Sequence, residues 1–183
     1  MKKGLFIIGL FISFFSFSQG SQPPMEVTSG LQIKIRQGIE KEITGFRQKL
    51  LKDKENAVHI EFAVDTFRVE RFMVKCTEID YSDFGMREAT NAGSALYDSL
   101  LNKYYKKLSA VLKDDDKKAL VQAQRAWLAF RDNEMKLVET ISKDQYSGGG
   151  TIQQLTEASE YLNLVKERTI VLFEHYVRAT QNE

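Results

Sequence analysis

Apolar residues recur at intervals of three and four along most of the chain, with polar residues between them. In an α-helix this spacing gathers the apolar side chains on one face. The pattern predicts five helices, with apolar stripes that run from Leu31 to Leu50, over residues 56–76, from Met86 to Val111, from Leu120 to Ile141 and from Ile152 to Tyr176.

The segment over residues 56–76 is the least regular of the five. Its first half, residues 58–64, alternates apolar and polar positions as a strand does, whereas Ile60, Val64 and Phe67 also have helical spacing. The alternation stops at Asp65, and a strand here would have no obvious partner to pair with. We therefore favour a helix over a strand.

Polar residues and glycines separate the segments. Thr28 or Ser29 is a plausible N-cap for the first helix, Ser82-Asp83 resembles a cap for the third, and Thr151 can cap the fifth. Residues 113–116 break the third segment from the fourth, and residues 147–150, Ser-Gly-Gly-Gly, end the fourth. Short connections between long amphipathic helices imply antiparallel neighbours, so we predict an all-α antiparallel bundle of about five helices.

The N-terminus resembles a secretory signal. Lys2 and Lys3 precede an apolar run from Gly4 to Phe17, and small and polar residues follow. A retained membrane anchor is the alternative, but the run falls short of the ~20 residues that span a bilayer. We expect cleavage after Ser18, and because no cysteine lies at the cut we expect a periplasmic or secreted protein and not a lipoprotein.

The remaining chain is divided by composition and pattern into three parts. We expect a flexible N-terminus over residues 19–27, a helical extension over residues 28–76 and a second helical domain over residues 77–179. Removing Lys2 and Lys3 changes the formal charge from +1 to −1. A nearly neutral chain lacks the basic surface that nucleic-acid binding requires. Cys76 is the only cysteine, so no intrachain disulfide can form.

No catalytic centre is evident. His59 and His175 belong to no metal-binding motif, and Cys76 has no evident partner base. Acidic residues that could gather cations have no calcium-loop spacing, and we interpret them as solvated faces; they are Glu61, Asp65, Glu70 and Asp114 to Asp116. The sequence therefore predicts a non-enzymatic protein without a cofactor or a metal.

The stretch AQRAWLAFRD, residues 123–132, carries two arginines beside large aromatic residues. On a helix Ala123, Trp127 and Phe130 share one face, so Trp127 can enter the core while the guanidinium groups border it. Arg125 or Arg131 would then pair with Asp98 or with another acid of a neighbouring helix. The alternative is an anion-binding site built from Arg125, Arg131 and Arg168.

Residues 76 to about 176 resemble the bacterial LprI-type domain, named for a lysozyme inhibitor. The resemblance rests on an aspartate followed by Leu-Asn and a tyrosine, the AQRAW..FRD block, a Gly-Gly turn and a late arginine. These are Asp98, Leu101, Asn102, Tyr104, Gln124, Arg125, Trp127, Phe130, Arg131, Asp132, Gly148 to Gly150 and Arg168. Relatives typically carry paired cysteines, and Ala89, Met135 and Glu160 occupy positions where cysteine is usual, so this chain looks like a disulfide-free branch.

The resemblance implies an exported, helical, non-enzymatic protein, and lysozyme inhibition is the activity attached to the family name. Common lysozymes are cationic and carry two carboxylates in a cleft, so an inhibitor needs an acidic rim and a protruding loop. The candidate loop is residues 144–150, with Tyr146 as an aromatic anchor followed by Ser147, Gly148, Gly149 and Gly150. The alternative for this loop is a simple helix-helix turn. The alternative function is a structural or adaptor module that binds another protein of the cell envelope.

Overall fold

A computed structural model describes residues 23–181, and the helices within this range account for nearly all of it. The long helices are α1 (Ser29–Lys52), α2 (Ala57–Ile79), α3 (Asp83–Val111), α4 (Asp114–Ile141) and α6 (Thr151–Thr180), and a single turn, α5 (Asp144–Ser147), links the last two. The all-α class is confirmed, and residues 57–79 form a helix rather than a strand. The expected signal segment, residues 1–18, lies outside the described residues. None of the described helices is both long enough and apolar enough to cross a bilayer.

Side-chain caps fix the starts of the first three helices. Thr28 caps α1 and Ser82 caps α3, where the Ser82 hydroxyl accepts a hydrogen bond from the Gly85 amide at 3.0 Å. These two caps were expected from the sequence. Thr151 was expected to cap the last helix, but Gly150 occupies that position, and the Thr151 hydroxyl instead donates to Asp83 of α3.

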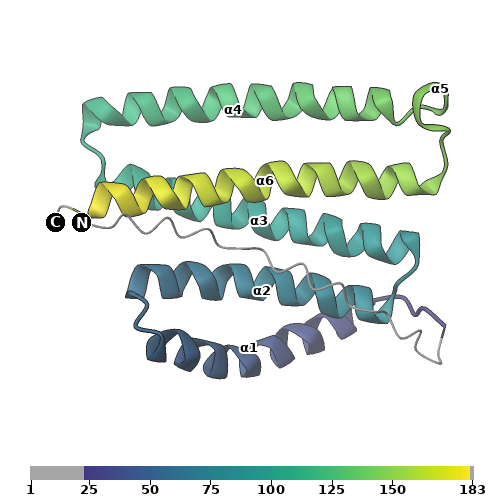
Figure 1. Ribbon diagram of the computed structural model, residues 1–183, viewed down its shortest axis with the longest axis horizontal. Helices are drawn as coiled ribbons and strands as arrows, with labels where there is room; N and C mark the ends of the chain where they lie inside the picture. The colour runs from purple at the N-terminus through teal and green to yellow at the C-terminus, as the bar shows by residue number, and fades with distance from the viewer. Residues whose placement is uncertain (1–22, 182–183) are drawn as a thin grey trace.

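The long helices lie in the order α1, α2, α3, α6, α4 across the molecule, so that α1 and α4 are the outer helices (Figure 1). Neighbours in the chain run antiparallel. Helices α3 and α6 run in the same direction because two reversals of the chain lie between them. The hydroxyl of buried Thr169 on α6 donates to the Tyr97 carbonyl on α3 at 3.3 Å, which shows how closely these two helices pack.

Helices α2, α3 and α6 share the larger hydrophobic core. At its centre the rings of Phe62 and Phe173 stack with centroids 3.9 Å apart, and the Tyr104 ring meets both edge-on at 5.1 and 5.4 Å. Such aromatic pairs add to the burial of apolar area. A second core joins α1 to α2 and to the first half of α3; its buried members are Ile39, Ile43, Ile60, Val64, Phe72, Cys76 and Ala89.

Ion pairs line the contact between α2 and α3. The Lys103 ammonium lies 2.5 Å from Asp65 and 2.8 Å from Glu61, and the hydroxyl of Tyr104 donates to Asp65 at 2.7 Å. The Lys107 ammonium bonds Glu61 as well. Asp65 is buried, so the expectation of a solvated face is wrong for Asp65, because its partners come from the neighbouring helix and periodicity within one segment cannot reveal them. Glu61 keeps 38 % of its side chain exposed, and Asp114 to Asp116 are exposed as expected.

A similar contact joins α2 to α6. The Glu70 carboxylate accepts hydrogen bonds from the Tyr97 hydroxyl at 2.6 Å and from Lys166 at 2.5 Å. Burial and the neighbouring Glu70 carboxylate together raise the pKa of Tyr97, so its hydroxyl stays protonated and donates. Glu70 therefore ties three helices together, although its side chain stays 40 % exposed.

Helix α4 is the least covered of the long helices. Within the described part of the chain it packs mainly on α6, and Leu120 is its buried residue. Trp127 is half-buried and packs against the larger core, whereas Phe130 is 53 % exposed. The expectation that Phe130 shares the buried face of Trp127 is therefore wrong, because α4 is an outer helix with one neighbour and only a narrow strip of it is covered.

Candidate functional site

The AQRAWLAFRD stretch lies on the middle of α4, where it faces α6. Two guanidinium groups contact the Trp127 ring. The guanidinium carbon of Arg131 lies 5.5 Å from the Trp127 ring centroid, and that of Arg168 on α6 lies 5.8 Å from it. The Nε of Arg168 donates to the side-chain oxygen of Gln124 at 3.0 Å, and Arg131 also lies over the Tyr161 ring of α6. This stack of cations and aromatic rings holds α4 on α6.

The partners of these arginines differ from those expected. Arg131 bonds Asp132, its neighbour in the sequence, at 2.6 Å, and Arg125 is exposed with no ion pair among the described residues. Asp98 accepts a hydrogen bond from Asn102 one turn away on α3. The residue that crosses between helices is Arg168, because it projects from α6 toward the face of α4 that carries Trp127.

Arg168 is a partly buried cation without a carboxylate within 4 Å in the described range. Burial lowers the pKa of its guanidinium, which nevertheless stays charged at every physiological pH. The Trp127 ring and the Gln124 carbonyl take the place of an acid. The proposed anion site would need Arg125 beside this pair, and the exposed position of Arg125 on α4 does not support it.

The hairpin between α4 and α6 ends in a short, hydrogen-bonded tip, residues 142–150. The Ser147 hydroxyl donates to the Ser142 carbonyl at 2.8 Å and accepts from the Gly149 amide at 3.1 Å. The Gly148 amide donates to the Asp144 carbonyl and closes the single turn of α5. These bonds fix the shape of the tip by contacts within it.

The three glycines of the tip all have positive φ, at 77°, 71° and 93° for Gly148, Gly149 and Gly150. This conformation strains residues with a Cβ. A Cβ on Gly149 would also lie 2.1 Å from an oxygen of Asp144, so that position has no room for a side chain. The glycines thus permit the turn, as expected if the loop is a simple helix-helix turn.

The tip also presents Tyr146 to solvent. Its side chain is 65 % exposed; Ile141 at the end of α4 and Ile152 in the first turn of α6 are exposed as well. Exposed aromatic side chains are typical anchors of protein-binding surfaces. A turn needs the glycines but not this tyrosine, so the geometry also suits a recognition loop.

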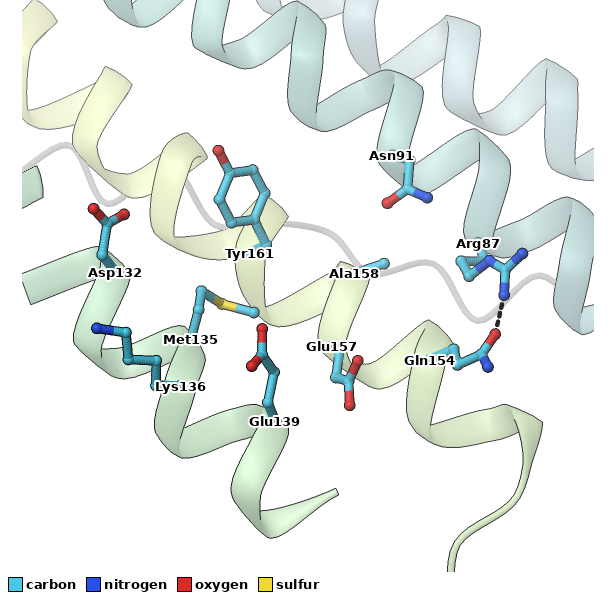
Figure 2. Close-up of a pocket in the computed structure, with 10 residues that line it drawn as sticks. All are labelled: Arg87, Asn91, Asp132, Met135, Lys136, Glu139, Gln154, Glu157, Ala158 and Tyr161. Atoms are coloured by element: carbon cyan, nitrogen blue, oxygen red, sulfur yellow. Dashed lines mark hydrogen bonds between the residues drawn. The ribbon is translucent and has the colours of Figure 1, made fainter. Parts of the chain in front are cut away.

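A groove runs between α4 and α6 next to the tip and reaches α3. Its volume is about 680 Å³. Figure 2 shows Met135 of α4 pointing across it toward Ala158 and Tyr161 of α6, and the hydrogen bond from Arg87 to Gln154 at its α3 end. The groove exists because the second half of α4 carries polar side chains opposite α6; the remaining lining residues are Asn91, Asp132, Lys136, Glu139 and Glu157.

The groove and the tip carry a small excess of negative charge. The groove is lined by the carboxylates Asp132, Glu139 and Glu157 and by the cations Arg87 and Lys136, and the tip adds Asp144 and Lys143. These four acids and three bases give a formal charge of −1. The charge of this end therefore gives only a weak attraction to a cationic protein.

The tip was predicted from the sequence, whereas the groove was not. Gln124, Trp127, Arg131 and Arg168 come together as one cluster, whereas Tyr104 is buried in the core and does not reach it. The groove residues come from three helices with no shared motif. No local signal in the sequence marks them as a group.

Comparison with known proteins gives one match. The family model described as "Lysozyme inhibitor LprI" matches residues 76–172, which include the last turn of α2, all of α3, α4 and α5 and most of α6. No curated protein and no solved structure matches the chain. The matched region covers more than half of the sequence and contains the Trp127 cluster, the tip and the groove. The chain therefore belongs to the lysozyme inhibitor LprI family.

Proposed function

We propose that this protein is an exported, non-enzymatic inhibitor of lysozyme-type glycosidases. The observation that carries the proposal is the exposed Tyr146 on a tip of fixed shape at the end of the α4–α6 hairpin. The family membership adds the class of partner. The N-terminal pattern of residues 1–18 supports export. An exported protein would meet lysozymes in the compartment where they act.

Inhibition requires occupation of the enzyme's cleft and no chemistry by the inhibitor. The tip is narrow because a single helical turn and three glycines complete the reversal of the chain. Tyr146 would enter the substrate cleft, where an aromatic ring can take the place of a sugar ring against apolar walls. Its hydroxyl would donate to one of the catalytic carboxylates of the enzyme.

The carboxylates of the groove would contact the basic surface around the cleft. Glu139 and Glu157 lie on the two helices that support the tip, so their carboxylates would meet lysines or arginines at the rim of the enzyme. Charges at the rim mainly raise the rate of association and depend on salt. The tip would therefore determine the lifetime of the complex, and the groove would determine how fast it forms.

The test is the lytic rate of several structural types of lysozyme in the presence of the protein purified without residues 1–18. We expect inhibition at micromolar concentration or below for at least one type. Tyr146→Ala should weaken it by about 2 kcal/mol, roughly thirtyfold in the inhibition constant. Ile33→Ala, which truncates an exposed apolar residue on α1 at the other edge of the molecule, should leave inhibition unchanged.

Two results would contradict the proposal. Full lytic activity of every lysozyme type at high protein concentration would contradict inhibition itself. Undiminished inhibition by Tyr146→Ala, with the same melting temperature as the parent, would leave inhibition standing but remove the tip as its site.

A further inference from the structure

The outward side of α4 carries a regular seam of exposed residues. Its positions follow one another at alternating steps of four and three, and we call it the outer seam: Ala119, Ala123, Ala126, Phe130, Asn133, Leu137 and Thr140. All seven are exposed, and Phe130 and Leu137 are 53 % and 51 % exposed. Alternating steps of three and four are the spacing by which two helices pair in a coiled coil.

The seam is separate from the surfaces already assigned on α4. At 100° per residue it lies about a third of a turn around the helix from Leu120 and Trp127, which face α6. The groove residues Met135 and Glu139 lie on the other side of Leu120 and Trp127 from the seam. No described element covers the seam, because α4 is the outer helix at this edge of the molecule (Figure 1).

We propose that the outer seam pairs α4 of one molecule with α4 of a second copy in antiparallel orientation, forming a two-fold symmetric dimer. In the antiparallel register centred near Ala129, Phe130 lies opposite Ala126 of the second copy. Leu137 likewise lies opposite Ala119 of the second copy. Each of the two large seam residues then faces an alanine, which lets the two helices approach closely there.

Charges beside the seam match in this register. Asp115, Gln122, Ala129 and Lys136 form the row that flanks it on the side away from α6, and Lys143 follows two residues after the end of α4. Antiparallel pairing places Asp115 opposite Lys143 of the second copy, and Gln122 opposite Lys136 of the second copy. The two Ala129 residues meet near the symmetry axis, where small side chains are required.

Parallel pairing lacks this complementarity. It would place the first turns of both α4 helices at the same end, and each first turn carries Asp114, Asp115 and Asp116. It would also align the two helix dipoles. The antiparallel arrangement separates the aspartates and leaves the exposed Tyr146 of the two tips at opposite ends, although Lys136 of the groove and Lys143 of the tip would lie beside the dimer contact.

The first test is sedimentation of the protein, purified without residues 1–18, over a series of dilutions. We expect a monomer–dimer equilibrium, and Phe130→Glu should raise its dissociation constant by roughly a hundredfold. Leu128→Glu is the matched control, because Leu128 lies on the same helix but on the opposite side from the seam. A monomer at every concentration, or equal effects of the two substitutions in folded proteins, would overturn the proposal.

The second test exchanges the flanking charges. Asp115 bonds Lys118 on its own helix at 3.1 Å, and both are highly exposed, so that contact is weak. Asp115→Lys and Lys143→Asp should each weaken the dimer by several-fold, because each places like charges opposite one another. The double variant should restore dimerisation, since the two charges are then reversed together. Additive weakening in the double variant would overturn the register.

The third test fixes the orientation. In a Cys76→Ser background, Ala129→Cys places two thiols near the symmetry axis, where a short bifunctional maleimide can link them. Ala119→Cys is the control, because residue 119 lies opposite residue 137 of the second copy, which puts the two thiols about 27 Å apart. We expect a linked dimer from Ala129→Cys alone. Efficient linkage from both variants would overturn the antiparallel arrangement.

Discussion

At the scale of single residues, Trp127 is a structural contact of the family motif. Its ring is half-buried and lies between Arg131 and Arg168. We expect Trp127→Ala to lower the free energy of unfolding by about 2 to 3 kcal/mol, less than a fully buried aromatic residue would. Arg125→Ala, an exposed neighbour in the same motif, should change it by less than about 0.5 kcal/mol. Urea denaturation measures both, and equal effects would contradict the stacked arrangement.

Cys76 illustrates how burial changes the chemistry of one side chain. It lies in the same buried cluster as Ala89, one of the positions where relatives typically carry cysteine. Burial raises the pKa of its thiol, against a smaller opposing effect of Arg36. We expect slow alkylation of the native protein, with a rate that rises only at a higher pH than for a free thiol. Reaction with iodoacetamide as fast as in urea would contradict a buried thiol.

At the scale of elements, the hydrogen bond from Tyr104 joins α3 to α2. Its hydroxyl donates to the buried Asp65 carboxylate, and burial together with that carboxylate raises the pKa of Tyr104. Tyr104→Phe leaves one acceptor site of Asp65 unfilled and should cost about 1.5 to 3 kcal/mol. Tyr105→Phe is the matched control, because the Tyr105 hydroxyl has no hydrogen bond in the described part of the chain. Equal melting temperatures for the two variants would contradict this role of Tyr104.

Most elements were predictable because local signals determine them. The helix starts at Thr28 and Ser82 follow from capping chemistry, which involves residues three apart in the sequence. The one-turn α5 was missed because four residues show no periodicity. The exposed state of Phe130 was missed for another reason: periodicity predicts an apolar face, but which neighbour covers that face depends on the whole arrangement.

At the scale of the whole molecule, the order of the helices determines what each face does. The sequence predicted antiparallel neighbours, but it could not show that α3 and α6 would pack in parallel at the centre, because contacts such as Thr169 to Tyr97 join distant segments. The tip was predictable from its glycines and tyrosine. The groove and the outer seam depend on α4 lying at the edge of the molecule, and both therefore required the structure.

The stability of the contact between α1 and α2, at the opposite edge of the molecule, depends on pH. Helix α1 is held to α2 by its apolar stripe and by two ion pairs, in which Arg68 donates to Glu40 at 2.7 Å and Arg71 donates to Glu42 at 2.9 Å. These hydrogen bonds lower the pKa of Glu40 and of Glu42 below the ordinary value of 4.5. A carboxyl group with a lowered pKa in the folded state stabilises that state above its unfolded pKa. The stabilisation is lost as the pH falls through the folded pKa.

We therefore expect the urea midpoint to fall as the pH drops from about 5 to below 4. The double substitution Glu40→Gln/Glu42→Gln should lower the midpoint at pH 7 slightly, because exposed ion pairs contribute little. It should also flatten the decline below pH 5, because these two groups no longer take up protons on unfolding. Glu160→Gln/Glu167→Gln, which removes two exposed acids of α6 without ion pairs among the described residues, should leave the slope unchanged. If both double variants showed the parent slope, the acid sensitivity would reside in the Glu61 pairs with Lys103 and Lys107 instead of in α1.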